Sequence, residues 1–463
     1  MTDIYSKASI AISNTNGKTP YIKVTRGLLQ GEPLSPLLFA LFLSDLETFM
    51  RENGIRGVQM NHLKEVLLLG YADDLAFFAD SPVQMRKILL VLQKYCKLNL
   101  LTVNVRKTKI MVFHKGGFNV NEYKFFYENE TLEVVKSYKF LGVEFFHSGN
   151  HEFTSNQIIS KTLSASGIVL SLINRMKIDS WPICKKLFDS LISSVLLYAA
   201  STWSINYLDK VEKVQTSFLK KMFTLPNNTP GHLVRLETGT THTAVRIFED
   251  IINWIYNLTK MNDERYPKIC FLRLKELALR FPSSEPRYNW IIQIRKNFLD
   301  KINVNIQDVF SAIKSQSYRD FLVEKMRRAY LQEDLERSYS SNALFFAQYL
   351  NYDNSTPRYF VYFTSIKTLK TISQLRLLNK YNERLIIKNK LLKAEKNGRC
   401  YFCGTQNNIF HMINECPRFI EERNKAFGPF SDFVSNIVNV SGSNVKITLS
   451  FIEELATKID INK

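Results

Sequence analysis

The chain has 463 residues, of which 45% are hydrophobic and 23% charged, a composition that is ordinary for a folded protein. Its net charge of +19 is not ordinary, and it predicts a polyanionic partner such as nucleic acid. No apolar run approaches the roughly 18 residues of a membrane span, and residues 1–19 lack the apolar core of a secretory signal. We therefore expect no membrane partner and an intracellular location, nuclear or cytoplasmic.

The N-terminal stretch contains a predicted hairpin, a loop and a helix. Residues 10–24 alternate around a turn and indicate the hairpin. In residues 26–36, two glycines allow close approach of the backbone to a ligand, and Gln30 offers an amide to a base or sugar edge. Ser35 is a suitable N-cap and Pro36 a suitable first residue for a helix that ends near Asn53 and Gly54. An ordinary loop before an ordinary helix is the alternative interpretation.

Tyr71-Ala72-Asp73-Asp74 lies between two apolar runs, residues 66–69 and 75–79. This pattern predicts two short strands joined by a tight turn, with Asp73 and Asp74 at the exposed bend. Adjacent carboxylates are typical ligands of Mg²⁺, and two such ions can activate the attacking hydroxyl and stabilise the leaving oxygen in nucleotidyl transfer. The alternative is a surface turn in which Asp merely tolerates the turn geometry.

The following elements predict an α+β fold with a sheet under helices. A helix is expected from Ser81 and Pro82 to about Leu101, followed by a basic turn at residues 104–109, a strand at 110–113 and further β-type sequence to residue 145. We expect this helix to turn Leu89, Leu92, Tyr95 and Cys96 inward.

The order of these motifs resembles the palm of a reverse transcriptase, and more narrowly that of the non-LTR (LINE-type) retrotransposon polymerases. The resemblance implies that Asp73 binds the catalytic metals, Mg²⁺ or Mn²⁺, with help from Asp74. It also implies contacts to template, nucleotide and primer from other positions. These implied substrate-binding residues are Gln30, Gly31, Pro33, Ser35, Tyr71, Lys107, Phe140, Leu141 and Gly142. The implied partners are an RNA template, a DNA primer or target and deoxynucleoside triphosphates.

One part of that family pattern is absent from the sequence. The family has a further metal-binding aspartate on a strand upstream of the Gln30-Gly31 loop, but the only aspartate before this loop is Asp3, which lacks the strand context. We therefore expect a truncated palm in which the hairpin has lost a neighbouring strand, leaving an apolar edge uncovered. This chain alone is expected to show little or no polymerase activity.

From residue 160 the sequence predicts helices at residues 161–176, 180–198 and 206–223. The last helix should bury its apolar residues and leave four lysines at the surface, where they either follow a nucleic-acid backbone or form an ordinary solvated face. A helical thumb is what the resemblance implies here, together with the Leu-Pro and Thr-Pro pairs near residue 226. The buried apolar residues are Leu208, Val211, Val214, Phe218 and Met222, and the lysines are Lys210, Lys213, Lys220 and Lys221.

Three of the six cysteines cluster with a histidine as Cys400-x2-Cys403-x7-His411-x4-Cys416. This donor set and spacing predict a closed tetrahedral Zn²⁺ site, whereas chance proximity is the alternative. It also resembles the zinc knuckle that follows the polymerase in LINE-type proteins, with Tyr401 and Phe402 as faces on which bases can stack. The other three cysteines, Cys96, Cys184 and Cys270, are interpreted as buried thiols of a protein in a reducing compartment.

The sequence thus predicts a partial palm at 1–148, a helical thumb at 149–265, a helical extension at 266–395, a CCHC zinc knuckle at 396–425 and a C-terminal tail at 426–463. The residues after Cys416 are too few for a nuclease domain. Two functions stay open at this point. One is the RNA-directed DNA polymerase of a non-LTR retrotransposon, incomplete and inactive as this chain. The other is a non-catalytic nucleic-acid-binding protein derived from one, which binds through basic helices and the zinc knuckle.

Overall fold

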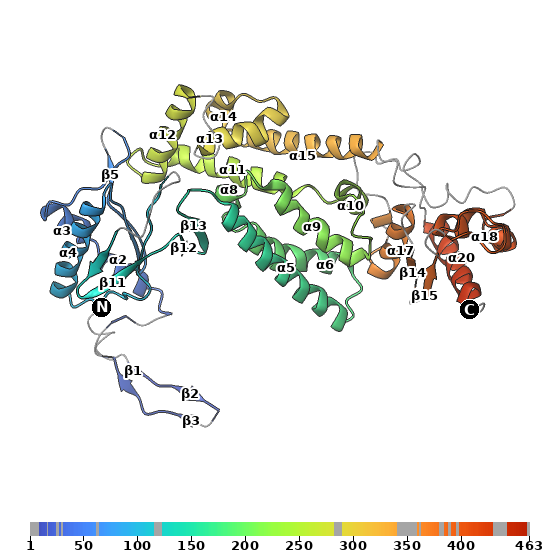
Figure 1. Cartoon of the computed structure of the whole chain (residues 1–463), viewed down its shortest axis with the longest axis horizontal. Helices are drawn as coiled ribbons and strands as arrows, with labels where there is room; N and C mark the ends of the chain where they lie inside the picture. Colours follow the sequence, from blue (N-terminus) through green and yellow to red (C-terminus); the bar gives the residue numbers. More distant parts are fainter. Residues whose placement is uncertain are drawn as a thin grey trace. The chain divides into compact units, whose positions relative to one another are not determined.

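The computed structural model describes residues 9–15, 17–24, 27–28, 31–61, 64–114, 123–281, 289–339, 359–360, 363–378, 384–387, 390–394, 398–428 and 442–460. The chain forms two units, Met1–Lys136 and Ser137–Lys463, each with its own core (Figure 1). The described elements confirm the α+β class. None of the described helices is both long and apolar enough to span a membrane.

The first unit begins with the predicted hairpin. Strand β1 (Ser9–Ile10) pairs with β4 (Ile22–Lys23), and β2 (Ser13–Asn14) pairs with β3 (Gly17–Lys18) around the turn. The helix expected after it is present in two pieces. Helix α2 (Ser35–Phe42) ends in a turn, and α3 (Leu46–Glu52) ends at Asn53 and Gly54 as predicted.

The prediction that Ser35 caps this helix was wrong. Leu34 occupies the N-cap position and Ser35 is the first helical residue, with its hydroxyl 3.3 Å from a carboxylate oxygen of Glu32. The predicted single helix is broken because residues 43–45 form a turn, in which Asp45 accepts a hydrogen bond from the buried hydroxyl of Tyr95 at 2.5 Å. The helix is thus broken at a residue that contacts Tyr95, which lies 50 residues later in the sequence.

The core of the first unit lies between helices and small sheets. Helix α4 (Pro82–Leu98) starts at Ser81, whose side chain accepts from the Gln84 backbone N–H. It buries Leu89, Leu92, Tyr95 and Cys96, as predicted. Helix α3 lies beside α4 (Figure 1). On the other side α4 packs on β10 (Phe125–Tyr127), the edge strand of a three-stranded sheet of order β10-β11-β9 formed with β11 (Glu130–Val134) and β9 (Lys109–Ile110).

Two further hairpins complete the first unit. Strand β5 (Val58–Gln59) pairs with β6 (Glu65–Val66), and β7 (Leu68–Tyr71) pairs with β8 (Asp74–Phe77). The backbone of Gly57 lies close to the backbone of Val66, and a Cβ at residue 57 would be 2.4 Å from the Val66 carbonyl oxygen. Only glycine fits at that position, so a side chain there would push apart the two segments that lead into β7.

The second unit opens with a hairpin of β12 (Ser137–Phe140) and β13 (Val143–Phe146), followed by helices. Helix α5 (Glu152–Arg175) begins nine residues before its predicted start. The predicted helix at 180–198 is divided into α6 (Trp181–Leu187), a π-helical turn η2 (Phe188–Ser193) and α7 (Ser194–Leu196). Helix α9 (Leu208–Phe223) follows the short helix α8 (Ala200–Trp203) and lies close to its predicted place.

One core of this unit gathers helices from its first half and middle. It contains parts of α5, α8 and α9 with the helices that follow them, and its buried side chains include Trp203, Phe248 and Phe298. The following elements are α10 (Gly231–Thr238), α11 (Thr243–Lys260), α12 (Tyr266–Arg280), α13 (Trp290–Ile294), η4 (Arg295–Leu299), η5 (Asp300–Ile302), α14 (Ile306–Ala312) and α15 (Gln316–Tyr339).

A second core joins the end of α9 to the C-terminal elements. Helix α17 (Ile366–Arg376) packs on α9, and α18 (Ile420–Phe427) packs on α20 (Gly442–Asp460) (Figure 1). Between them lie the hairpin β14 (Arg384–Ile387) and β15 (Lys390–Lys393) and the turns η7 (His411–Glu415) and η8 (Pro417–Phe419). Cys400 and Cys416 belong to the same apolar cluster as Phe223, so the cysteine region and the end of α9 share one core.

Candidate functional site

The Tyr71-Ala72-Asp73-Asp74 segment forms the bend that the sequence predicted. Tyr71 pairs with Asp74 at the last rung of the β7–β8 hairpin, which leaves Ala72 and Asp73 as a two-residue loop. Both aspartates are exposed. Two carboxylates projecting from a rigid bend can bind a hard divalent cation together with water and phosphate oxygens.

The bend contains a strained backbone position. Ala72 has a φ of 53°, in the left-handed region that costs a non-glycine residue roughly 1–2 kcal/mol. A positive φ at the first loop residue belongs to the tight turns whose twist matches that of the flanking strands. Ala72 thus determines the direction in which the chain continues to Asp73. Strained backbone positions of this kind are common at functional sites.

The hairpin has little cover for its apolar surface. The exposed fractions are 40% for Leu69 and 66% for Tyr71, and helix α2 also exposes Leu37 and Leu41. Within the described residues, β7 and β8 form a sheet of two strands only. Among the same residues, one group of three or more Asp, Glu, His or Cys side chains could hold a metal ion, and it is the cysteine cluster. No third metal ligand therefore accompanies Asp73 and Asp74 in the described structure.

The remaining predicted substrate-binding residues are distributed over both units. Gln30 lies outside the described residues, as does Asp3, while Gly31, Pro33 and Ser35 lead into α2. Lys107 is exposed in the turn before β9, where its backbone N–H donates to the side chain of Asn104. These residues share the first unit with Asp73.

Phe140, Leu141 and Gly142 lie in the second unit, at the tip of the β12–β13 hairpin. Leu141 and Gly142 have φ values of 47° and 84°, the two positive angles of a type I′ hairpin turn. The hydroxyl of Tyr198 donates to the Leu141 carbonyl at 2.7 Å, and a Cβ on Gly142 would lie 3.0 Å from the Tyr198 ring. The loop is thus fixed against the helical region, and glycine leaves room for the ring.

The four predicted zinc ligands converge in the second unit. One ligand atom from each of Cys400, Cys403, His411 and Cys416 can be chosen so that all lie within 4.8 Å of one another. The Sγ atoms of Cys400 and Cys416 are 3.7 Å apart, and Cys403 Sγ is 3.2 Å from His411 Nε2. Zn–S bonds of about 2.3 Å in a tetrahedron require sulfur atoms about 3.8 Å apart, so the spacing fits a four-coordinate ion.

The surrounding groups shift the pKa values of two of these cysteines in opposite directions. Burial disfavours the Cys400 thiolate, but hydrogen bonds from the backbone N–H groups of Phe402 and Cys403 and from His411 outweigh it and lower its pKa to about 6. Burial, together with Cys400, raises the pKa of Cys416 to about 11. Glu415 lies 3.3 Å from His411 Nδ1 and can orient the imidazole so that Nε2 faces the sulfur atoms.

The loop between the first two cysteines exposes aromatic faces. Tyr401 is 95% exposed and Phe402 56%, and the Arg418 guanidinium lies 4.0 Å above the Phe402 ring. Aromatic and guanidinium planes of this kind stack on unpaired bases.

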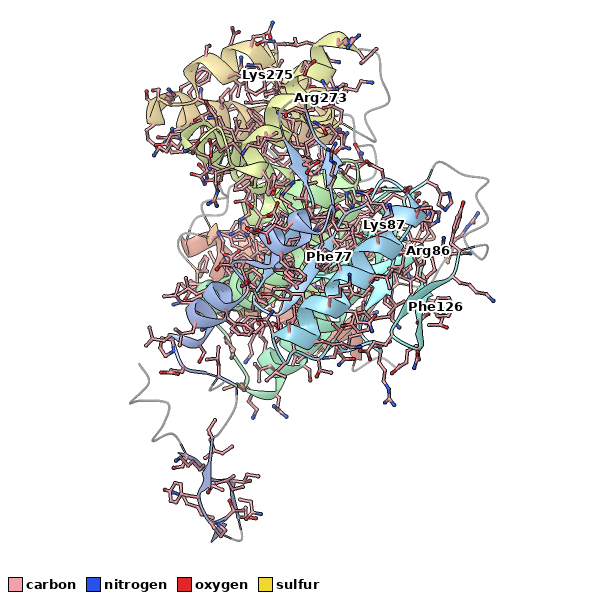
Figure 2. The ribbon with its side chains drawn as sticks, turned by 90° about the vertical axis from the view of Figure 1, so that its left-hand side faces the viewer. Phe77, Arg86, Lys87, Phe126, Arg273 and Lys275 are labelled. Carbon is pink, nitrogen blue, oxygen red and sulfur yellow. The ribbon has the colours of Figure 1, made fainter. Side chains whose placement is uncertain are left out.

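The lysines of α9 are less available than the sequence suggested. Lys213 and Lys221 are exposed. Lys210 pairs with Glu152 at 3.2 Å, and Lys220 donates to the Asn227 carbonyl at 2.9 Å. In the first unit, α4 presents Arg86, Lys87, Lys94 and Lys97 on its outer side and contains no acidic residue; Figure 2 labels the first two. Each unit thus contributes its own basic surface.

Comparison with known proteins assigns a family to the hairpin. The family described as "Reverse transcriptase (RNA-dependent DNA polymerase)" matches residues 2–145. This segment is similar to reverse transcriptases over about a third of the chain. The match spans both the Asp73 bend and the Leu141-Gly142 loop. It covers the first unit from residue 2 and the β12–β13 hairpin up to residue 145.

Two curated relatives each match about a third of the chain. Both are named "Retrovirus-related Pol polyprotein from type-1 retrotransposable element R2" and come from Popillia japonica. One is 29% identical over 161 residues, which cover 32% of this chain and 22% of the relative. The other is 26% identical over 155 residues, covering 32% of this chain and 25% of the relative. The chain thus matches about a quarter of the length of these relatives.

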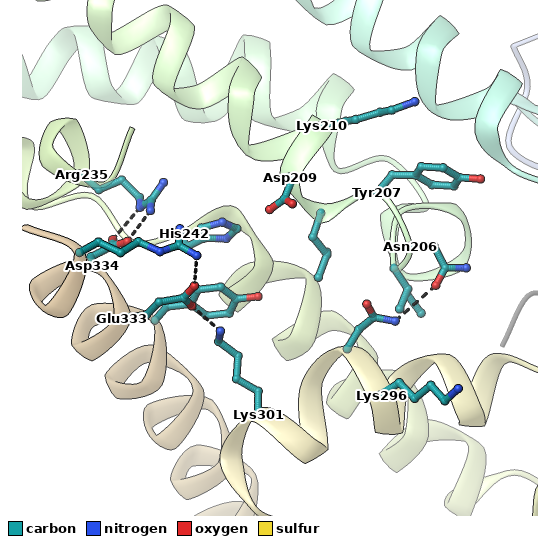
Figure 3. A pocket seen from close by; sticks show the side chains of 15 residues that line it. Asn206, Tyr207, Asp209, Lys210, Arg235, His242, Lys296, Lys301, Glu333 and Asp334 are labelled. Carbon is teal, nitrogen blue, oxygen red and sulfur yellow. Dashed lines mark hydrogen bonds and ion pairs between the residues drawn. The ribbon is translucent and has the colours of Figure 1, made fainter. Parts of the chain in front are cut away.

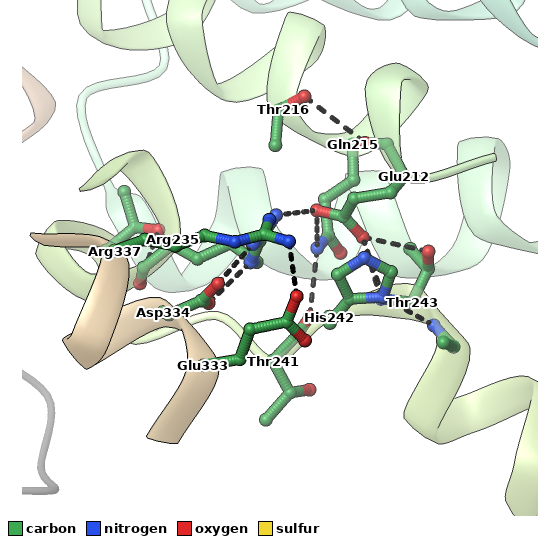
Figure 4. A network of polar contacts seen from close by, with 12 residues as sticks. Glu212, Gln215, Thr216, Arg235, Thr241, His242, Thr243, Glu333, Asp334 and Arg337 are labelled. Atoms are coloured by element: carbon green, nitrogen blue, oxygen red, sulfur yellow. Dashed lines mark hydrogen bonds and ion pairs between the residues drawn. The ribbon is translucent and has the colours of Figure 1, made fainter. Parts of the chain in front are cut away.

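Sequence reasoning missed a buried polar network in the second unit (Figure 4). The Arg235 side chain donates to both carboxylate oxygens of Asp334 and, at 3.0 Å, to Glu212. Glu212 also accepts from the backbone N–H and the hydroxyl of Thr243, both at 2.8 Å. Because burial raises the pKa of Glu212 while Arg235 and Thr243 lower it, these contacts oppose its neutralisation. The network ties α9, α10, α11 and α15 together.

A second buried pair starts from the same helix. Glu237, which is fully buried, accepts from Arg376 of α17 at 2.8 Å and from the hydroxyl of Tyr359. Helix α10 thus connects to α15 through Arg235 and to α17 through Glu237. The only sequence signal was an Arg and a Glu, two residues apart, on a short helix that also contains Leu233, Val234 and Leu236.

One cysteine interpretation was wrong. Cys96 and Cys184 are buried as predicted, but Cys270 is exposed on α12. Apolar and charged residues are mixed along α12, so its sequence does not show clearly which side of the helix is buried. The exposure of Cys270 could therefore not be predicted from the sequence.

Proposed function

We propose that this chain is part of the RNA-directed DNA polymerase of a non-LTR retrotransposon, with Asp73 and Asp74 as its metal-binding carboxylates. The observation that carries the proposal is the exposed, strained bend that presents both aspartates within a segment matching the reverse transcriptase family. Residues 1–148 would be a partial palm, and the helices of residues 149–265 the thumb. The substrates would be an RNA template, a DNA primer or target and deoxynucleoside triphosphates.

In this proposal the chain's own residues hold and orient the reacting groups. Bound Mg²⁺ or Mn²⁺ would supply the charge that activates the primer hydroxyl and stabilises the leaving oxygen. Asp73 and Asp74 would hold the ion, and Lys107, exposed in its turn, would face the triphosphate. The Phe140-Leu141-Gly142 loop, held by Tyr198, would position the primer end, while Gln30, Gly31, Pro33, Ser35 and Tyr71 would line the template and nucleotide.

The proposed polymerase site is incomplete in the chain as described. Two-metal catalysis requires a ligand that bridges the ions, and none accompanies the two aspartates among the described residues. We therefore predict little or no primer extension by the purified chain with an RNA template, a DNA primer and Mg²⁺ or Mn²⁺. Robust synthesis that Asp73→Asn abolishes and Asp80→Asn leaves intact would contradict this prediction. Asp80 is a suitable control because it is an exposed aspartate three residues after the end of β8, away from the bend.

A second function, nucleic-acid binding without catalysis, is favoured by the missing ligand and by three retained features. These are the net charge of +19, the basic outer side of α4 and the cysteine cluster with its exposed Tyr401 and Phe402. Zn²⁺ is the ion that best suits three thiolates and one imidazole without an open position. Zinc in this cluster would hold the aromatic loop in place.

Binding through these basic surfaces predicts a steep salt dependence. RNA affinity should fall by at least about a hundredfold between 50 and 200 mM salt, because each phosphate contact releases counterions. Lys213→Ala and Lys221→Ala should each reduce the logarithmic salt slope by up to about one. Fluorescence anisotropy with a labelled RNA at several salt concentrations measures both effects. A flat salt dependence would rule out the basic surfaces as the binding site.

A further inference from the structure

Helix α4 of the first unit carries apolar residues on the side that faces solvent (Figure 2). The exposed fractions are 59% for Val83, 61% for Leu90 and 72% for Leu98. The opposite side of the helix is buried in the core of the first unit, where Ile88 and Leu92 pack. A single exposed apolar residue is common on a protein surface, but a row of them on one helix is typical of an interaction surface.

Two lysines lie within the same row of residues. At about 3.6 residues per turn, positions 83, 87, 90, 94 and 97 follow one face of a helix at spacings of four and three. Lys87 and Lys94, both exposed, therefore alternate with Val83 and Leu90 along this face. These four residues, with Leu98 at the end of the helix, are called the α4 stripe below.

The two lysines of the α4 stripe have no partner in the part of the chain that the structure describes. Neither Lys87 nor Lys94 forms an ion pair or a hydrogen bond there, and α4 itself contains no acidic residue. Lys97, beside the stripe, lies 3.7 Å from a carboxylate oxygen of Glu128. The stripe therefore keeps two positive charges available to another molecule.

Basic residues around the polar pocket of the second unit differ from these two lysines (Figure 3). This pocket of about 600 Å³ is lined by Arg235 and Lys301, which bind the carboxylates of Asp334 and Glu333. The chain itself compensates the positive charges of these two residues. The α4 stripe, by contrast, combines uncompensated positive charge with exposed apolar side chains.

We propose that the α4 stripe binds an acidic amphipathic helix of another protein. Leucines of that helix cover Val83, Leu90 and Leu98, and its carboxylates pair with Lys87 and Lys94. The stripe extends about 22 Å from residue 83 to residue 98, which is enough for four turns of a partner helix. An interface of this size is small and typical of transient complexes. The proposal goes beyond nucleic-acid binding and does not depend on polymerase activity at Asp73.

Three other partners fit the stripe less well. A nucleic acid pairs its phosphates with the lysines but leaves the apolar side chains against a charged backbone. A membrane surface accepts the apolar residues, but the two lysines lie in the middle of the row rather than on a separate polar face. A second copy of this chain brings the lysines of one stripe close to those of the other, and like charges repel one another.

Fluorescence anisotropy with the full chain and labelled helical peptides tests the proposal. The probe has about 21 residues, or three heptads, in which leucine and glutamate alternate at spacings of three and four. A scrambled peptide has the same composition but no apolar face. The ordered peptide should bind at least about tenfold more tightly, because only its leucines reach Val83 and Leu90 together. Equal affinities would mean that net charge alone attracts both peptides, and would overturn the proposal.

Reversing the charges on both partners identifies the surface that binds the peptide. The double variant Lys87→Glu, Lys94→Glu should bind the glutamate peptide at least about tenfold more weakly and should gain affinity for a peptide with lysine in place of glutamate. An unfolded variant cannot produce this gain. Lys314→Glu, which changes an exposed lysine of the second unit, should leave both affinities unchanged. If the double variant behaves like Lys314→Glu, the peptide binds elsewhere and the proposal is refuted.

Leu90→Ser separates a protein-binding surface from a nucleic-acid-binding one. This variant should weaken the glutamate peptide about tenfold, because burial of a leucine is lost, and should leave RNA affinity unchanged. Leu279→Ser, at a leucine of α12 that is 59% exposed, should change neither affinity. Equal losses of RNA and peptide binding in Leu90→Ser would assign the stripe to nucleic acid. Binding to phosphatidylserine vesicles that Leu90→Ser abolishes would assign it to a membrane, and either result would contradict the proposal.

Discussion

Replacing Cys403 by serine should release one metal ion per chain and expose the backbone of residues 399–419 to solvent exchange. The wild-type protein should contain about one zinc, measured by mass spectrometry of the metal. Structural zinc stabilises zinc-finger peptides by roughly 10–16 kcal/mol, and a large part of that free energy should be lost from this region. Hydrogen exchange reports the loss locally.

The expected pattern of exchange follows from the hydrogen bonds around the cluster. The N–H of Gly404 donates to the Cys400 carbonyl at 2.8 Å, and the N–H of Cys416 donates to the His411 carbonyl at 2.8 Å. These bonds close the two turns that bring the ligands together. Without the ion, the bonds that join the four ligands are lost and the turns open. Because Cys400 and Cys416 also belong to the core that contains α17 and α20, protection should decrease there as well.

Helix α11 and Cys270 provide the controls for this experiment. Helix α11 is buried in the other core of the second unit, so its amides should keep their protection. Cys270→Ser removes an exposed thiol far from the ligand set in sequence and should retain both the metal and the exchange pattern. A wild-type protein without zinc, or a Cys403→Ser variant with unchanged protection, would show that the cysteines are not a metal site.

The features that the sequence predicted correctly depend on local signals. The β7–β8 hairpin follows from two apolar runs around a short polar turn, and α4 follows from Ser81, Pro82 and a helical spacing of apolar residues. The cysteine cluster follows from ligand type and spacing, with Gly404 at a φ of 72° in its turn. In each case neighbours along the chain determine the structure, so no distant contact had to be known.

The features that it missed depend on distant partners. Arg235 and Asp334 are 99 residues apart, and Glu237 and Arg376 are 139 apart. Charged residues are normally exposed, so only the three-dimensional structure shows that each has a partner that permits burial. The break between α2 and α3 and the π-helical turns η2 and η4 are equally invisible in an apolar pattern.

Replacing Arg235 by methionine should lower the free energy of unfolding by about 3–5 kcal/mol. Methionine fills a similar volume but leaves the carboxylates of Glu212 and Asp334 in the interior without a counter-charge. All three side chains are only 6–7% exposed, so water cannot replace the lost interaction. Arg246→Met is the matched control, because Arg246 binds the Asp189 carboxylate at 2.8 Å on the surface and should contribute less than about 1 kcal/mol. Urea denaturation of both variants measures the difference.

The pH dependence of the Arg235→Met variant identifies the cause of its instability. Burial already raises the folded-state pKa of Glu212 and Arg235 opposes this rise, so loss of the guanidinium raises that pKa further. His242, 3.7 Å from Glu212, loses one of the positive charges that lower its pKa and also gains affinity for a proton. The folded variant then binds more protons than the unfolded variant, so its stability rises relative to the wild type as pH falls. The difference in unfolding free energy should therefore narrow between pH 7 and pH 5. A difference that is independent of pH would mean that lost packing around α10, rather than uncompensated charge, destabilises the variant.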